Sequence, residues 1–230
     1  MQGLGTLAVA ALVWIGVHVG IAGTAVRRAA VSRLGENGFR LAFSALSFAA
    51  IFFLVRSYNV SGTTPLWTAP DWLRWLLVVA MLLAFVLFAA SLTSPNPTAV
   101  GGERALGAAE PRGVQRITRH PMLWSFVIWA AVHMLGNGDT ASLLFFGAFG
   151  ATALAGMPSI DAKVAAREPE AWDRFAARTS ILPFGAIAGG RNRLDLGEMG
   201  WKPWAIGFAL WAALLASHRW LFGVSPLPSG

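Results

Sequence analysis

The sequence predicts an all-α, polytopic integral membrane protein, a bundle of about six transmembrane helices with both termini periplasmic. Of the 230 residues, 56% are hydrophobic and only 13% are charged, whereas soluble domains carry about a quarter charged residues. Several apolar runs approach the roughly 20 residues that a membrane-spanning helix needs. The basic residues lie between these runs, mostly on one side of a six-helix arrangement. Composition, run length and charge distribution therefore favour the same fold class.

Six apolar runs are candidates for membrane spans. The fourth and fifth are short, and the turn sequence Gly-Asn-Gly-Asp at 136–139 predicts that they form an antiparallel hairpin. The segment 161–184 mixes apolar and charged side chains, which predicts a cytoplasmic amphipathic segment. Because nothing indicates a second domain, we expect residues 1–230 to form a single transmembrane domain. The predicted spans are Leu4–Val26, Phe39–Val55, Trp72–Leu92, Pro121–Leu135, Ala141–Met157 and Trp201–Phe222.

The distribution of basic residues predicts the orientation. Fifteen of the 18 lysines and arginines, at positions between 27 and 40, 104 and 119, and 163 and 202, fall on one side of the six-span arrangement in its loops and at the adjoining span ends. Only Arg56, Arg74 and Arg219 fall on the other. The positive-inside rule assigns the basic side to the cytoplasm. Arginines follow the first run instead of preceding it, as expected of a retained first helix. We therefore expect a multi-pass membrane protein with both termini facing out and the lipid bilayer as its main partner.

Composition also excludes several kinds of site. The net charge of +7 does not indicate a nucleic-acid partner, because the arginines form short clusters instead of a basic stripe with interleaved aromatics. The chain has no cysteine, which excludes disulfides and thiolate ligands. It has no Gly-rich phosphate loop, zinc-type His-Glu spacing, nucleophile elbow or pair of carboxylates within a span.

Two histidines lie well inside predicted spans, away from the span ends, where ionisable groups need a partner or a role. His18 is flanked by Gly16 and Gly20, and His133 shares a helix face with Ser125, Trp129 and Asn137. Each has a structural interpretation: His18 bonded to a carbonyl of another helix, and His133 in a polar seam between helices. The alternative is that two imidazoles on different helices, about 10 Å apart along the membrane normal, are axial ligands of a haem iron.

Other polar residues lie at the ends of the predicted spans. The Arg119-His120-Pro121 sequence opens the fourth span; proline there is a helix-start signal, and the Arg-His pair would suit an anionic group. Asp139 is expected to be a solvated turn residue, and Asp161 to form a cap or a salt bridge. His218, beside Arg219 and Trp220, is expected at the outer membrane interface.

Four motifs in combination are specific: Arg33–Arg40, Arg116–Pro121, Trp129–His133 with Asn137–Asp139, and Trp172 with Thr179–Phe184. Together they resemble the NnrU family of bacterial membrane proteins, which is similar to 15-cis-ζ-carotene isomerase, a haem b enzyme. The resemblance implies a bacterial inner-membrane protein with a haem b ligated by His18 and His133, and with polar or aromatic contacts from Arg119, His120 and Trp129. It also implies either isomerisation of a hydrophobic polyene or a role in nitrogen-oxide metabolism and denitrification.

The sequence departs from the isomerase at one position and leaves two rival function classes. Where the isomerase has a cysteine implicated in redox-dependent ligand exchange, this chain has Ala130. The Arg119-His120-Pro121 motif and Leu182-Pro183-Phe184 are also similar to membrane methyltransferases that use S-adenosylmethionine to modify isoprenylcysteine or phospholipid. However, Met122, Leu123 and Trp124 replace the aromatic and glycine that usually follow the His-Pro pair. A non-catalytic assembly factor or transporter is the third class.

Overall fold

The protein is described by a computed structural model that covers residues 3–21, 24–98 and 110–228. Arg104 of the predicted basic loop lies outside these described residues. Throughout the described ranges the regular structure is helical, apart from one isolated bridge between Pro65 and Asp139. The helices belong to two compact units, residues 1–70 with 130–156 and residues 71–129 with 157–230. The predicted all-α class is confirmed.

Five helices in the described part of the chain are long and apolar enough to cross a membrane. The helix α5 (Pro121–Asn137) corresponds to the fourth predicted span and, with 17 residues, is shorter than the others. The count of six spans and the orientation of the termini stay predictions. The five are α1 (Leu4–Ile15) with the π-helix Gly16–Ile21, α2 (Ala25–Val60), α3 (Asp71–Thr93), α6 (Thr140–Arg167) and α9 (Lys202–Phe222).

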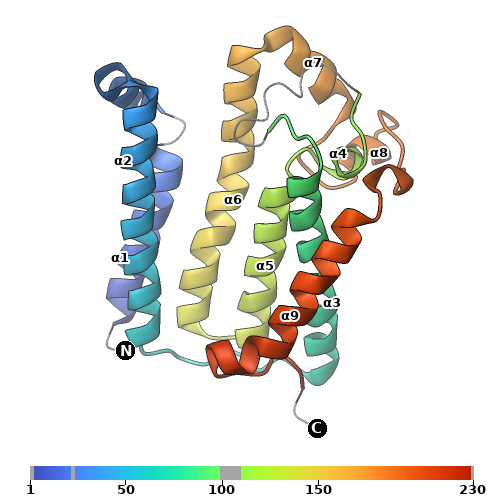
Figure 1. Cartoon of the computed structure of the whole chain (residues 1–230). Helices are drawn as coiled ribbons and strands as arrows, with labels where there is room; N and C mark the ends of the chain where they lie inside the picture. Colours follow the sequence, from blue (N-terminus) through green and yellow to red (C-terminus); the bar gives the residue numbers. More distant parts are fainter. Residues whose placement is uncertain (1–2, 22–23, 99–109, 229–230) are drawn as a thin grey trace. The chain divides into compact units, whose positions relative to one another are not determined.

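In the first unit, α1 and α2 form an antiparallel hairpin (Figure 1). Gly3 at the start of α1 lies beside Ser61 after α2, since a Cβ at Gly3 would be 3.1 Å from the Cα of Ser61. The amides of Leu66 and Trp67 donate to the carbonyl of Gly138 in the turn between α5 and α6, at 2.8 and 3.1 Å. The start of α1, the segment after α2 and this turn therefore lie at one end of the unit.

The prediction that the basic residues after the first span lie in a loop is wrong, because residues 27–40 are part of α2. The helix begins at Ala25, where the Thr24 side chain accepts a hydrogen bond from the amide of Val26. Gly35, with φ of +71°, interrupts the helical geometry. Arg27 nevertheless bonds to Glu36 across this break at 2.7 Å. Alanine, leucine, arginine and glutamate favour helix, so the segment stays helical outside the apolar core.

In the second unit, α3 and α9 lie side by side (Figure 1). Gly207 of α9 faces the backbone of α3, and a Cβ there would be 2.7 Å from the Cα of Val86. The indole Nε1 of Trp211 donates to the carbonyl of Val78 at 2.9 Å. Small residues at such contacts let membrane helices approach closely.

We expect Gly207→Leu to separate α3 from α9 and to destabilise the protein by about 1–3 kcal/mol, the usual cost of overpacking. The measurement is thermal unfolding of the detergent-solubilised protein. Ala209→Leu is the matched control, because Ala209 lies on the same helix and is exposed. Equal midpoints for the two variants would contradict the close α3–α9 contact.

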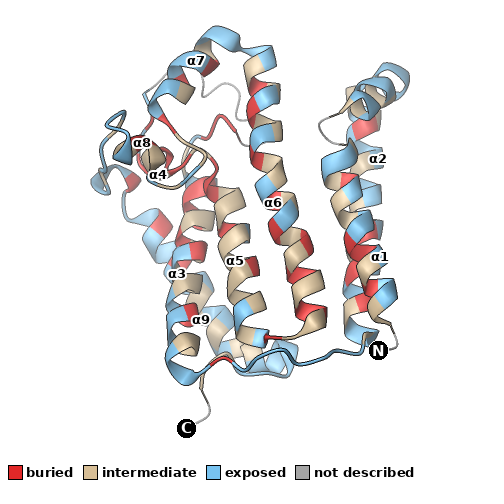
Figure 2. Cartoon of the chain, turned by 180° about the vertical axis from the view of Figure 1, so that it is seen from behind, coloured by how far each residue is buried: buried red, intermediate tan, exposed pale blue. Residues whose placement is uncertain are grey.

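The connections of the second unit form a compact end structure, and the loop around α4 (Val114–Ile117) contains a run of buried residues (Figure 2). The predicted amphipathic segment 161–184 is not one element. Its first part continues α6 to Arg167, and α7 (Pro169–Arg178) follows with Trp172 and Phe175 buried. The short helix α8 (Gly185–Ala188) and a 3₁₀ turn, Gly197–Met199, lead to α9.

Candidate functional site

His18 lies in the π-helix Gly16–Ile21, which continues α1. π-Helical turns are rare in proteins, and those that occur are often found at functional sites. The Nδ1 atom of His18 lies 2.9 Å from the carbonyl oxygen of Trp14. Because a carbonyl only accepts, this bond requires a proton on Nδ1 and leaves the lone pair of a neutral imidazole on Nε2. A backbone carbonyl bound to one ring nitrogen is the usual support of a metal-ligating histidine.

The two glycines that flank His18 leave open space on the helix, but this space does not lie beside the His18 ring. A Cβ at Gly16 or Gly20 would meet no atom of a described residue within 4 Å, so both flanks are open. In a π-helix, however, residues two positions apart point to nearly opposite sides, so the open flank lies away from the imidazole. The imidazole ring of His18 instead contacts Trp14 of its own helix and Phe43 of α2, whose ring centroid is 5.6 Å away.

Trp14 is the closest aromatic neighbour of His18, with ring centroids 3.9 Å apart. Its indole Nε1 is buried and has no hydrogen-bond partner among the residues that the structure describes. A buried donor without a partner costs about 1–3 kcal/mol, so such a group indicates a ligand or a strained site. Sequence reasoning missed Trp14, because an apolar run gives no reason to single out one tryptophan.

A series of aromatic contacts connects His18 with His133 inside the first unit. His133 stacks on Phe146 of α6, with ring centroids 4.7 Å apart and an interplanar angle of 25°. Trp14 contacts Phe149, also on α6, at 4.8 Å. The structure thus brings both predicted ligands to one aromatic cluster on α1, α5 and α6. Between the two histidines the series runs through Trp14, Phe149, Phe145 and Phe146.

Ala130 of α5 is fully buried. A Cβ added at Gly150 of α6 would lie 3.3 Å from the Cβ of Ala130. The two small residues therefore let α5 and α6 pack closely one turn before His133.

Asp139 and its neighbours form a polar network at the end of the first unit. Asp139 accepts hydrogen bonds from the amide and hydroxyl of Ser142 at 2.9 and 2.7 Å and from the hydroxyl of Thr63. Burial alone would raise the pKa of Asp139, but these hydrogen bonds outweigh it and lower the pKa. Asp139 lies in the turn between α5 and α6, as expected, and is partly exposed; it is also the N-cap of α6. Asn137 donates to the same Ser142 hydroxyl at 3.0 Å.

Arg119 and His120 both bind Asp161 in the second unit. Nη2 and Nε of Arg119 donate to one carboxylate oxygen of Asp161 at 2.7 and 2.9 Å. Nε2 of His120 donates to the other oxygen at 2.7 Å. His120 is 2% exposed, and the Arg119 guanidinium also lies over the ring of Trp172 at 5.3 Å. The salt bridge expected at Asp161 is confirmed, and its partners are two of the three residues predicted to contact a cofactor.

The segment that precedes α5 is hydrogen-bonded to the segment that follows α7. The hydroxyl of Thr118 and the indole of Trp124 donate to the carbonyl of Ile181 at 2.8 and 2.7 Å. The amide of Phe184 donates to the carbonyl of Ile117 at 2.8 Å. These bonds fix the Arg116–Pro121 segment against the Thr179–Phe184 segment.

The remaining predicted site residues are placed as follows. Trp129 is half-buried on α5, one turn before His133, and makes contacts of its own. His218 lies in the last turns of α9, with Nδ1 2.9 Å from the carbonyl oxygen of Val224. No group of three or more His, Asp or Glu side chains able to hold a bare metal ion occurs among the described residues.

Comparison with known proteins relates almost the whole chain to one family. The family model described as NnrU protein matches residues 6–226. The 15-cis-zeta-carotene isomerase, chloroplastic, of Arabidopsis thaliana is 27% identical over 188 residues, which are 80% of this chain and 50% of the relative. The protein of the same name from Zea mays is 28% identical over 185 residues, 77% of this chain and 49% of the relative. The chain thus spans about half the length of these curated relatives, and no solved structure matches it.

Proposed function

Because the chain belongs to the NnrU family, we propose that it is a membrane-bound isomerase of a long apolar polyene, acting at a haem b held by His18 and His133. The observation that carries the proposal is the similarity to two proteins named as isomerases over about four fifths of this chain. The chemistry of the donor set at His18 fits the cofactor. We also propose that the protein lies in a bacterial inner membrane, as the family resemblance implies, with both termini periplasmic, as the charge distribution predicts.

The residues of this chain would hold and orient the cofactor. The Trp14 carbonyl keeps a proton on Nδ1 of His18, which leaves Nε2 as the atom that would hold the cofactor. Phe146 stacks on His133 and limits the rotation of its ring. Haem supplies one-electron chemistry, which lowers the barrier to rotation about a polyene double bond.

The unpartnered Trp14 N–H is a second point of fit. It is a buried donor in contact with the His18 ring, and a cofactor held by His18 that presents an acceptor would satisfy it. The aromatic rings from Trp14 to Phe146 make the surroundings of the two histidines apolar, which suits a polyene substrate. Since the chain has no cysteine and Ala130 is buried, exchange of a ligand through a thiolate is not available to it.

The test is isomerisation in cells that accumulate 15-cis-ζ-carotene. We expect expression of this chain to convert the 15-cis isomer, with the products separated by chromatography. The His18→Ala and His133→Ala variants should each lose the conversion, and His218→Ala should retain it. Membrane-inserted, haem-loaded protein that leaves the 15-cis isomer unchanged would contradict the isomerase proposal.

A further inference from the structure

The second unit contains an open cleft of about 450 Å³ that is rich in arginine. We call it the arginine cleft. Four guanidinium groups line it, together with a single carboxylate, that of Glu110. Clusters of arginine are suited to phosphate, because each planar guanidinium presents donors that match two phosphate oxygens. The lining residues are Glu110, Pro111, Arg116, Arg178, Gly190, Arg191, Asn192 and Arg193.

Two of the four cations in the arginine cleft are paired with carboxylates. Arg116 binds Glu198 with Nε at 2.7 Å and Nη2 at 2.8 Å, and Arg178 binds Glu110. The hydrogen bond from Arg116 lowers the pKa of Glu198 to about 2, so this partner is ionised at physiological pH. Neither Arg191 nor Arg193 has a carboxylate partner among the described residues. The cleft therefore keeps two positive charges that its own acids do not balance.

The arginine cleft is a built structure and not a set of loose side chains. Arg191 donates through Nη1 to the carbonyls of Ala177 and Thr179 at 2.9 and 3.1 Å, which fixes it at the C-terminal end of α7. Asn192 donates to the carbonyl of Arg178 at 2.8 Å and accepts from Arg116 at 2.6 Å. Because these bonds order the cleft in advance, a ligand loses less free energy to side-chain ordering.

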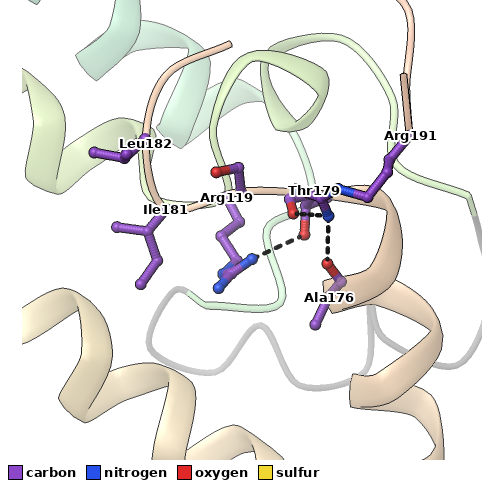
Figure 3. A pocket seen from close by; sticks show the side chains of 7 residues that line it. Arg119, Ala176, Thr179, Ile181, Leu182 and Arg191 are labelled. Carbon is purple, nitrogen blue, oxygen red and sulfur yellow. Dashed lines mark hydrogen bonds between the residues drawn. The ribbon is translucent and has the colours of Figure 1, made fainter. Parts of the chain in front are cut away.

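The arginine cleft adjoins a second pocket with apolar lining residues, and Arg191 lines both. The second pocket, of about 320 Å³, is also lined by Arg119, Ala176, Ile181 and Leu182 (Figure 3). Leu182 is 64% exposed. Further exposed apolar side chains in the same part of the chain are Phe184, Leu194, Leu196 and Trp201.

This combination lies next to a membrane span. α9 begins at Lys202, directly after the exposed Trp201, and the arginine cleft residues 190–193 precede it by about ten residues. Arginines close to a span end lie at the level of lipid headgroups, and tryptophan marks the same level. Exposed leucine and phenylalanine beside them reach the acyl chains.

We propose that the arginine cleft binds the phosphate of an anionic phospholipid, with the lipid's acyl region against Ile181 and Leu182. Arg191 and Arg193 supply the two unbalanced charges, and the apolar rim excludes water from one side of the phosphate. The chemistry in question is a phosphate diester with apolar chains. A zwitterionic phospholipid carries its own cation and so competes poorly for these arginines.

The test is the thermal unfolding of delipidated protein in detergent with increasing lipid. Phosphatidylglycerol should raise the midpoint, whereas phosphatidylcholine and free glycerol phosphate should not. Arg191→Gln with Arg193→Gln should weaken the apparent phosphatidylglycerol affinity by roughly tenfold or more, as expected for two charge-assisted phosphate contacts. Arg56→Gln with Arg219→Gln is the matched control, because it removes the same charge elsewhere.

Two outcomes overturn the proposal. One is that phosphatidylglycerol raises the unfolding midpoint of the Arg191→Gln, Arg193→Gln variant as much as that of the Arg56→Gln, Arg219→Gln control. The other is stabilisation by free glycerol phosphate as strong as that by the lipid, which would indicate a soluble phosphate ligand. Should the double variant fail to fold because Arg191 binds α7, Arg193→Gln alone decides, since no bond of its guanidinium to a described residue is found. We expect that single variant to lose part of the lipid response.

Discussion

Replacing Asp161 with asparagine is expected to cost roughly 3 kcal/mol of unfolding free energy or more, the usual penalty for removing one member of a buried ion pair. The Asp161 carboxylate binds both Arg119 and His120, and the Arg119 and Asp161 side chains are each only 12% exposed. The substitution leaves the Arg119 guanidinium without its counter-charge. Because the bond joins α6 to the segment that opens α5, the damage should extend to both elements.

Thermal unfolding of the solubilised protein measures this loss. Glu36→Gln is the matched control, since it makes the same acid-to-amide change in an ion pair whose carboxylate is 42% exposed. Surface pairs contribute about 0–1 kcal/mol, so the control should change little. If Asp161→Asn and Glu36→Gln lowered the midpoint by similar amounts, the bonds of Asp161 to Arg119 and His120 would not hold α6 to the segment that opens α5.

Gly138→Ala is expected to have the second large effect, of about 2 kcal/mol or more. Gly138 has φ of +65°, a conformation that costs alanine about 1–2 kcal/mol. An added Cβ would also lie 2.2 Å from the carbonyl oxygen of Trp67. The backbone would have to move, and the hydrogen bonds from Leu66 and Trp67 to the Gly138 carbonyl would weaken.

Gly223→Ala separates the two causes. Gly223 has φ of +76°, and a Cβ there would meet no atom of a described residue within 4 Å, so this variant carries only the conformational cost. We expect Gly138→Ala to be clearly the less stable of the two in thermal unfolding. A Gly138→Ala variant as stable as Gly223→Ala would show that the turn does not pack against Trp67 as described.

Much of the fold was predictable, because long apolar runs and turn residues carry strong signals. The Trp72–Leu92 run lies within α3, and the Gly-Asn-Gly-Asp turn joins α5 to α6 as expected. The segment at 27–40 was not predictable as helix, since its charge indicated a loop and its helix-forming residues carried no periodic apolar face. Charge identifies the side of a membrane but not the conformation of the backbone.

The candidate site was predictable in part. Burial in apolar runs singled out His18 and His133, and the structure places both at one aromatic cluster. Binding of both Arg119 and His120 to Asp161 was not predictable, because the partners are 41 and 42 residues apart in sequence. Trp14 was also missed, since the lack of a bonding partner is a property of tertiary structure.

The absorption spectrum of the purified protein tests the central claim, that His18 and His133 hold a haem, most directly. We predict a Soret band in the wild-type protein expressed with an adequate haem supply. His18→Ala and His133→Ala should each change the band, and the double variant should lack it while staying folded, with His218→Ala as the control that keeps it. A wild-type protein that is folded and haem-free after such expression, or a double variant with an unchanged Soret band, would contradict the account.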